Sequence, residues 1–147
     1  MIERTVSLMN SRDLPFQLDV RLPAEDRAHP VIIVCHGFKG FKDFAFFPYT
    51  SQRLCEQGFA VVTMNFSGNG IGDDPVTFTE LDKFAQNTIG QELDDVEAVL
   101  EGISTGGLLG ASGDLQRLGI MGHSRGGCTA IIKASLDSRL KCLATWA

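Results

Sequence analysis

Long apolar runs are missing from this sequence. No stretch approaches the roughly 20 consecutive apolar residues that a helix needs to cross a bilayer, and the start, Met1 to Val6, lacks the apolar core of a signal peptide. Basic residues are in the minority, because 13 lysines and arginines stand against 18 acidic residues and give a net charge of −5. We therefore expect neither a membrane nor a nucleic acid as a partner.

Cysteine is scarce as well. The sequence has no C-x-x-C spacing, and three of its four cysteines lie inside apolar segments: Cys35, Cys128 and Cys142. This pattern favours reduced, mostly buried thiols in a cytoplasmic protein, with no metal and no cofactor. A content of 44% hydrophobic and 21% charged residues is typical of one globular domain with a sizeable core.

One motif organises the rest of the chain. Gly122-His123-Ser124-Arg125-Gly126 follows a short apolar run at residues 118–121 and precedes a helical pattern at residues 128–136. A Gly-x-Ser-x-Gly sequence between a strand and a helix is typical of a nucleophile elbow, a sharp turn that exposes a serine hydroxyl. The two glycines keep side chains out of the tight turn, and the following helix directs its free N–H groups at the serine. The motif therefore indicates Ser124 as a nucleophile.

Strands and helices alternate through most of the sequence. Weak alternation at residues 2–9, clean alternation at 16–22 and apolar runs at 31–35, 59–66, 118–121 and 140–146 predict strands. Residues 48–57, 88–103 and 128–136 are predicted to be helices, the second with its apolar stripe at Ile89, Leu93, Val96, Leu100 and Ile103. The pattern indicates an α/β fold with a mostly parallel sheet and helices on both faces.

Two candidate groups fall at the same edge of this sheet. His36-Gly37-Phe38 ends the strand at 31–35 and Ser124 ends the strand at 118–121, so both belong to the rim formed by the carboxyl ends of the strands. Acyl transfer needs two N–H donors for the oxyanion that develops on the substrate. We expect these donors to be the backbone N–H groups of Arg125 and Phe38.

This order of motifs and elements resembles the α/β-hydrolase superfamily, and within it the compact esterase and dienelactone-hydrolase-like members. The resemblance implies Ser124 as nucleophile, Phe38 and Arg125 as backbone oxyanion donors, and first four strands in the spatial order one, two, four, three, followed by five onward. It implies a serine hydrolase that cleaves a carboxylic ester through an acyl-enzyme. In the family the triad acid and histidine follow strands seven and eight, whereas the strand at 140–146 corresponds to the sixth.

No histidine of the chain fits the role of triad base. His29 is expected in a loop far from the rim, His36 is structural in the family, and the ring of His123 should point away from the neighbouring hydroxyl. We therefore expect residues 1–147 to be the N-terminal part of a single α/β-hydrolase domain, cut after the sixth strand and inactive alone. Its expected partners are the C-terminal remainder of that domain, or a second copy through the open sheet edge.

Several segments allow a structural as well as a functional interpretation. Residues 38–49 hold six aromatic side chains that either line an apolar acyl or aryl pocket or pack the next helix onto the sheet. Lys39, Lys42 and Asp43 either contact a carboxylate substrate or are solvated, and we expect them to be solvated. The run Glu92, Asp94, Asp95 and Glu97 lies off the apolar stripe and predicts a solvated helix face. The glycines at 68, 70 and 72 lack the spacing of a dinucleotide site and predict a loop.

Two other functions remain compatible with these residues. The first is a non-catalytic protein of the same fold that binds a small ligand. The second is another acyl-transfer chemistry on the same fold, that of a peptidase or a thioesterase. The sequence names no substrate beyond a small ester with an apolar acyl or aryl part.

Overall fold

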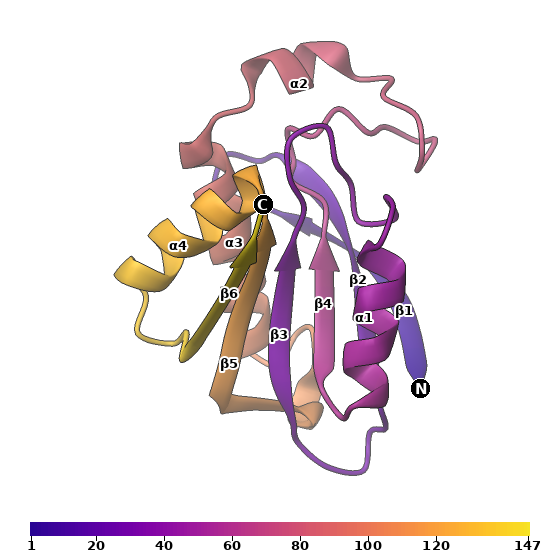
Figure 1. Ribbon diagram of the computed structural model, residues 1–147, viewed down its shortest axis with the longest axis vertical. Helices are drawn as coiled ribbons and strands as arrows, with labels where there is room; N and C mark the ends of the chain where they lie inside the picture. The colour runs from indigo at the N-terminus through magenta and orange to yellow at the C-terminus, as the bar shows by residue number, and fades with distance from the viewer.

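The computed structural model describes residues 1–147 and contains one six-stranded sheet with helices on both faces (Figure 1). The elements in chain order are β1 (Ile2–Met9), β2 (Pro15–Leu22), β3 (His29–Cys35), α1 (Phe47–Glu56), β4 (Ala60–Met64), α2 (Leu81–Gln86), α3 (Ile89–Ser104), a 3-10 turn (Gly110–Ser112), β5 (Gly113–His123), α4 (Arg125–Leu136) and β6 (Cys142–Trp146). All predicted strands and helices are present, within a few residues of the expected bounds except that β5 begins five residues earlier.

The strand order is β1-β2-β4-β3-β5-β6. β1 and β2 run antiparallel to their neighbours, whereas β4, β3, β5 and β6 are parallel to one another. This is the order that the resemblance to the α/β-hydrolases implied, and the fold is confirmed. Because four neighbouring strands are parallel, their carboxyl ends form one rim, at the top of Figure 1.

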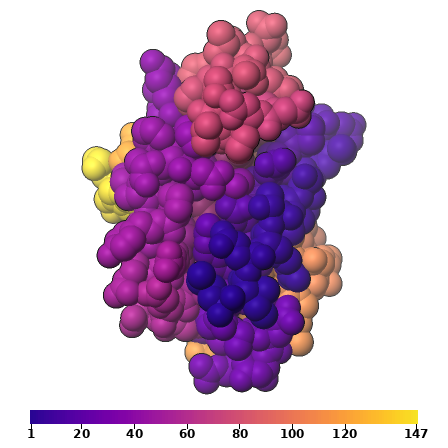
Figure 2. Space-filling view, turned by 90° about the vertical axis from the view of Figure 1, so that its right-hand side faces the viewer, coloured from indigo at the N-terminus to yellow at the C-terminus, as the bar shows by residue number.

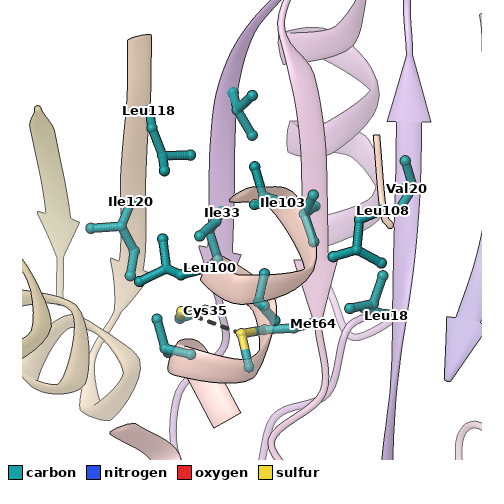
Figure 3. Close-up of a cluster of buried hydrophobic side chains, with 14 of the residues drawn as sticks. Leu18, Val20, Ile33, Cys35, Met64, Leu100, Ile103, Leu108, Leu118 and Ile120 are labelled. Carbon is teal, nitrogen blue, oxygen red and sulfur yellow. Dashed lines mark hydrogen bonds between the residues drawn. The ribbon is translucent and has the colours of Figure 1, made fainter. Parts of the chain in front are cut away.

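Alternating side chains of the central strands supply the two sides of the core. Val31, Ile33 and Cys35 of β3 point to the face that α3 and α4 cover, where 21 buried residues form one cluster. Figure 3 shows part of this cluster, in which Leu100 and Ile103 of α3 lie against the sheet. The opposite face is covered by α1, and there only four residues form a buried cluster, among them Val34 and Phe47.

The segment around α2 stands above the rim. Neither α2 nor the single bridge that pairs Ile71 with Phe78 was indicated by a sequence pattern. Figure 2 shows this segment, in rose, as a lobe at the top of the molecule. The glycine-rich residues 67–79 are a loop, apart from that bridge, as the spacing of their glycines indicated.

Two expectations about exposure were wrong in this part of the molecule. The alternation at residues 16–22 predicts a polar, solvated side of that strand, but two of its three residues are buried. Asp19 and Arg21 are only 3% and 6% exposed, whereas Gln17 is exposed. Lys42 is buried too, and its Nζ lies 2.9 Å from Asp19 Oδ2 and 2.6 Å from Asp43 Oδ2. Burial opposes the charge of Lys42, but the hydrogen bonds to Asp43 and Asp19 raise its pKa. The ion pair between Lys42 and Asp19 of β2 anchors the loop after β3 to the sheet.

The expectation of mostly buried thiols holds for half of the cysteines. Cys35 and Cys55 are buried, whereas Cys128 and Cys142 are exposed, and all four are free thiols. Cys128 lies on the outer side of α4 and Cys142 at the start of the last strand in the sheet order, so an apolar sequence context did not imply a buried position. None of the helices is long and apolar enough to span a bilayer.

Candidate active site

Ser124 occupies the turn between β5 and α4. Its backbone has φ 51° and ψ −118°, a left-handed conformation that costs a non-glycine residue about 1–3 kcal/mol. The residue is exposed, its side chain makes no hydrogen bond within the chain, and its N–H donates to the carbonyl of Trp146 at 2.8 Å. The turn is therefore the strand-to-helix elbow that the motif predicted, with the hydroxyl open to solvent.

Two glycines make this turn sterically possible. A Cβ on Gly122 would come within 2.7 Å of Gly127 Cα, and a Cβ on Gly126 would come within 2.7 Å of Cys35 O and closer still to His36 O. Real Cβ atoms do not approach backbone so closely. The elbow therefore packs backbone against backbone, and α4 sits directly on the end of β3.

The loop after β3 lies against the serine. A Cβ on Gly37 would be 3.2 Å from Ser124 Cβ and 3.0 Å from His123 O. The N–H of Phe38, which follows, makes no hydrogen bond within the chain. Arg125 is the first residue of α4, and its N–H likewise has no acceptor in its own helix. The expected oxyanion donors are thus two unpartnered N–H groups on the two segments that meet at Ser124.

His36 fixes the loop and has no free nitrogen. Its Nε2 accepts a hydrogen bond from the N–H of Phe66 at 3.1 Å, so Nδ1 carries the proton and donates to Gly37 O at 2.8 Å. Burial lowers the pKa of His36 to about 4, which keeps the ring neutral at pH 7. The structural role that the resemblance implied for His36 agrees with these contacts.

The other two histidines also lie away from the hydroxyl. The ring of His123 packs edge-on against Phe46 and lies 5.6 Å from the Trp146 ring centre. His29 is the first residue of β3, not part of a loop, and its ring bonds to the carbonyls of Gly58 and Ala24. No histidine of the chain hydrogen-bonds Ser124 Oγ, as expected. No cluster of three His, Cys, Asp or Glu side chains is arranged to hold a metal ion.

The prediction that the acidic run on α3 is a solvated face was wrong for two of its four residues, whereas Asp94 and Glu97 are partly exposed. Glu92 is 1% exposed and Asp95 is fully buried. Glu92 accepts hydrogen bonds from Arg125 Nε at 2.7 Å, Thr129 Oγ1 at 2.6 Å and Asn87 Nδ2 at 2.7 Å. The helix therefore turns Glu92 toward the elbow, and this carboxylate is a site residue that the sequence analysis missed.

Asp95 lies one turn further along α3 and joins other partners. It accepts from Asn10 Nδ2 at 2.7 Å and from both the N–H and the hydroxyl of Ser67, at 2.8 Å and 3.0 Å. Burial, opposed by these hydrogen bonds, raises the pKa of Asp95 to about 6. This carboxylate ties the loop after β4 and the β1–β2 turn to α3, but it does not contact α4.

The aromatic residues at the rim divide between the two interpretations. Phe41 and Phe47 are buried and pack the loop and α1 against the sheet. The remaining four are exposed at the rim: Phe38, Phe44, Phe46 and Tyr49. Phe38 stacks on Phe84 of α2 at 5.4 Å, and Phe46 lies beside His123 and Trp146. Lys39 is exposed, as expected.

Comparison with known proteins agrees with this geometry. Residues 18–146 match the model of the dienelactone hydrolase family. The chain belongs to this family. An uncharacterised 31.7 kDa protein from the traX-finO intergenic region of Escherichia coli is 29% identical over 126 residues, which are 86% of this chain but 40% of that protein. The chain thus spans about two fifths of the length of this curated relative.

Solved structures support the same fold. A dienelactone hydrolase from Anabaena variabilis matches with a TM-score of 0.76 at 15% identity, over 98% of this chain and 62% of its own. A cold-adapted esterase from an Arctic intertidal metagenomic library matches with a TM-score of 0.75 at 19% identity, over 97% of this chain and 59% of its own. Because the sequence identities are 19% or lower, this structural likeness establishes the α/β-hydrolase fold and nothing about substrate.

Proposed function

We propose that the protein is a serine hydrolase that cleaves carboxylic esters through an acyl-enzyme at Ser124. Ser124 Oγ attacks the ester carbonyl carbon and gives its proton to a base, while the carbonyl electron pair moves onto oxygen. The resulting oxyanion accepts hydrogen bonds from Phe38 N–H and Arg125 N–H. Collapse of the intermediate expels the alcohol, which takes up the proton, and water then releases the acid by the same steps.

One observation carries this proposal. An exposed, unbonded serine hydroxyl is held at φ 51° on a strand-to-helix turn, beside two segments that each present an unpartnered N–H. Strained backbone of this kind persists only where its surroundings fix it, and it gathers at active sites. Membership of the dienelactone hydrolase family and the esterase among the structural relatives support the same chemistry.

No histidine within residues 1–147 serves as the base in this proposal. We propose that these residues are the N-terminal part of one α/β-hydrolase domain and that the triad histidine and acid come from its remainder. The groove between α1 and β6 supports this, with a volume of about 440 Å³ and apolar lining from Ile32, Leu54, Phe59, Met121 and Ala144. A further strand beside β6 would cover the open edge of the sheet, and a helix over the groove would remove its apolar lining from water.

The proposed substrate is a small ester with an apolar acyl or aryl part. The rings of Phe38 and Phe46 are exposed, and one pairs with Phe84 of α2 and the other with Trp146 of β6. Such rings offer apolar contact area next to polar N–H groups, which is the composition expected of a small-molecule site. A cytoplasmic location is also part of the proposal, and the four free thiols support it.

Covalent labelling tests the nucleophile directly. The full-length protein is treated with a fluorophosphonate and digested, and the modified peptide is identified by mass spectrometry. We expect a single adduct on Ser124 and none in the Ser124→Ala variant. Ser135→Ala serves as the matched control, because Ser135 is another exposed serine of α4 and its loss should leave labelling unchanged. An adduct elsewhere, or none, contradicts the proposal and favours a ligand-binding protein.

A substrate panel tests the reaction class. Matched p-nitrophenyl esters, thioesters and peptide anilides are compared by kcat/KM. Faster hydrolysis of esters with longer apolar or aromatic acyl groups supports the proposal. Preference for the thioester or the peptide assigns the same elbow to a thioesterase or a peptidase instead.

A further inference from the structure

Glu92 stands out as a buried carboxylate with three hydrogen-bond partners on two segments outside its own helix. Its Oε1 accepts from Arg125 Nε and Asn87 Nδ2, and its Oε2 accepts from Thr129 Oγ1, all at 2.6–2.7 Å. The Glu92 side chain is 2% exposed, whereas that of Arg125 is 31% exposed. A buried carboxylate is tolerated only where its oxygens are paired in this way. Its two oxygens thus bond to the elbow helix α4 and to Asn87, between α2 and α3.

The two partners on α4 lie in its first turn and directly after it. Arg125 follows Ser124 immediately, and Thr129 lies four residues on, so both side chains are on the same face of α4. The first turn is closed by Gly127 N–H and Cys128 N–H, which donate to Ser124 O at 2.9 Å and 3.2 Å. Glu92 therefore holds the first turn of α4 through two side chains on one face of that helix.

We propose that Glu92 is the positioning residue for the elbow: through Arg125 and Thr129 it sets the direction in which the Arg125 N–H and Ser124 Oγ are presented. This inference rests on the proposed function. Ser124 keeps its left-handed backbone only while its neighbours hold it there, and Arg125 has no other hydrogen bond from its side chain. When Glu92 loses its charge, the long arginine side chain is free to leave for solvent and the first turn loses its lateral tie.

Activity measurements separate positioning from substrate binding. In the full-length protein we expect Glu92→Gln to lower kcat about 10- to 100-fold with KM changed less than about twofold, because displacing one oxyanion donor removes an interaction made in the transition state. Arg125→Lys, which keeps a charge that can reach Glu92, should retain more activity than Arg125→Met. Glu92→Gln combined with Arg125→Met should be no slower than the worse single variant, since both break one link.

Asp95→Asn is the matched control. It changes another buried carboxylate of the same helix, one whose partners Asn10 and Ser67 do not touch α4. We expect it to leave kcat within about twofold of the wild type, whatever its melting temperature. If Asp95→Asn lowers kcat as much as Glu92→Gln, or if kcat follows melting temperature across all variants, Glu92 has only a structural role and the inference is wrong.

Amide hydrogen exchange tests the inference without turnover. Glu92→Gln should speed the exchange of Gly127 and Cys128 at least tenfold relative to the last turn of α4, and Asp95→Asn should not. Unchanged exchange of these two amides in Glu92→Gln overturns the inference even if the enzyme is active. Faster exchange in a protein that hydrolyses no ester keeps the positioning role and refutes the proposed function instead.

Discussion

The two faces of the sheet differ in how much apolar surface they bury. The face under α3 and α4 buries 21 residues in one cluster and also holds the two buried carboxylates Glu92 and Asp95. The face under α1 buries a cluster of four and leaves an apolar groove of about 440 Å³ beside β6. Ser124 directly follows β5, at the rim of the sheet between these two faces. The face under α3 and α4, the closed face, supplies Glu92 to the elbow helix, whereas the face under α1, the open face, leaves an apolar groove uncovered in residues 1–147.

The largest effect should come from filling the contact between the elbow and β3. Gly126→Val places a side chain where Cys35 O and His36 O already lie, so we expect no folded protein or a loss of more than about 4 kcal/mol. Gly90→Ala is the control, because a Cβ there would meet only Arg12 Nη2 at 3.6 Å and Thr88 Oγ1 at 3.8 Å. It should be neutral or stabilising by up to about 1 kcal/mol. Urea unfolding measures both, and a folded Gly126→Val variant of normal stability would contradict the packing described.

The second prediction compares the same truncation on the two faces. Leu100→Ala on the closed face leaves a cavity among fully buried side chains and should cost about 3–4 kcal/mol. Leu54→Ala removes a half-buried side chain that borders the open groove and should cost about 1 kcal/mol. Chemical denaturation of residues 1–147 measures both, and equal losses would contradict the difference between the two faces. In the full-length protein, where the proposed helix covers the groove, Leu54→Ala should cost more than in residues 1–147.

The third prediction concerns pH and the closed face. Because burial raises the pKa of Asp95 to about 6, its contribution to stability is complete below pH 4 and is lost as pH rises through 6. Asp95→Asn removes this dependence, so the stability of the variant relative to the wild type should rise between pH 4 and 7, by on the order of 2–3 kcal/mol. Melting curves across this range test it, and a constant difference would refute the raised pKa.

The smallest effect on stability is expected at the edge of the open face. Leu143 of β6 is 41% exposed and has no neighbouring strand on its outer side. Leu143→Lys should lower self-association of residues 1–147 in sedimentation velocity, with the melting temperature changed by less than about 2 °C. The surface variant Gln52→Lys on α1 is the control. Self-association that is unaffected by Leu143→Lys would exclude this edge as the contact.

The elements and the elbow could be predicted because their signals are local. The Gly-x-Ser-x-Gly motif fixes its own turn, and the apolar runs of β3 and β4 identify central strands without reference to the rest of the chain. Burial of charge was not predictable in the same way. Thr129, which bonds to Glu92, lies 37 residues from it in sequence, and Lys42, which bonds to Asp19, lies 23 residues from it.

A weak signal for the buried carboxylates did exist. Glu92 and Asp95 continue the three- and four-residue spacing of Val99 and Ile103, all of which are buried. The apolar stripe at Ile89, Leu93 and Val96 lies to one side of that face, and Ile89 and Leu93 are only half-buried. A carboxylate in phase with an apolar stripe indicates a paired, inward-facing group, and only the tertiary structure supplies the arginine that pairs with it.

The sheet order also determines when the site can form during folding. β3 pairs with β5, so that Cys35 lies opposite Gly122, although most of the chain lies between them in sequence. The loop-closure entropy of this pairing must be overcome before any contact between Gly126 and the end of β3 can be made. Hairpin β1–β2 and helix α3 depend on local contacts and can form early, whereas the elbow assembles only with the last parallel pairings. The carbonyl of Trp146 accepts a hydrogen bond from the N–H of Ser124. The fluorescence change of Trp146 during refolding should therefore be among the slowest phases observed.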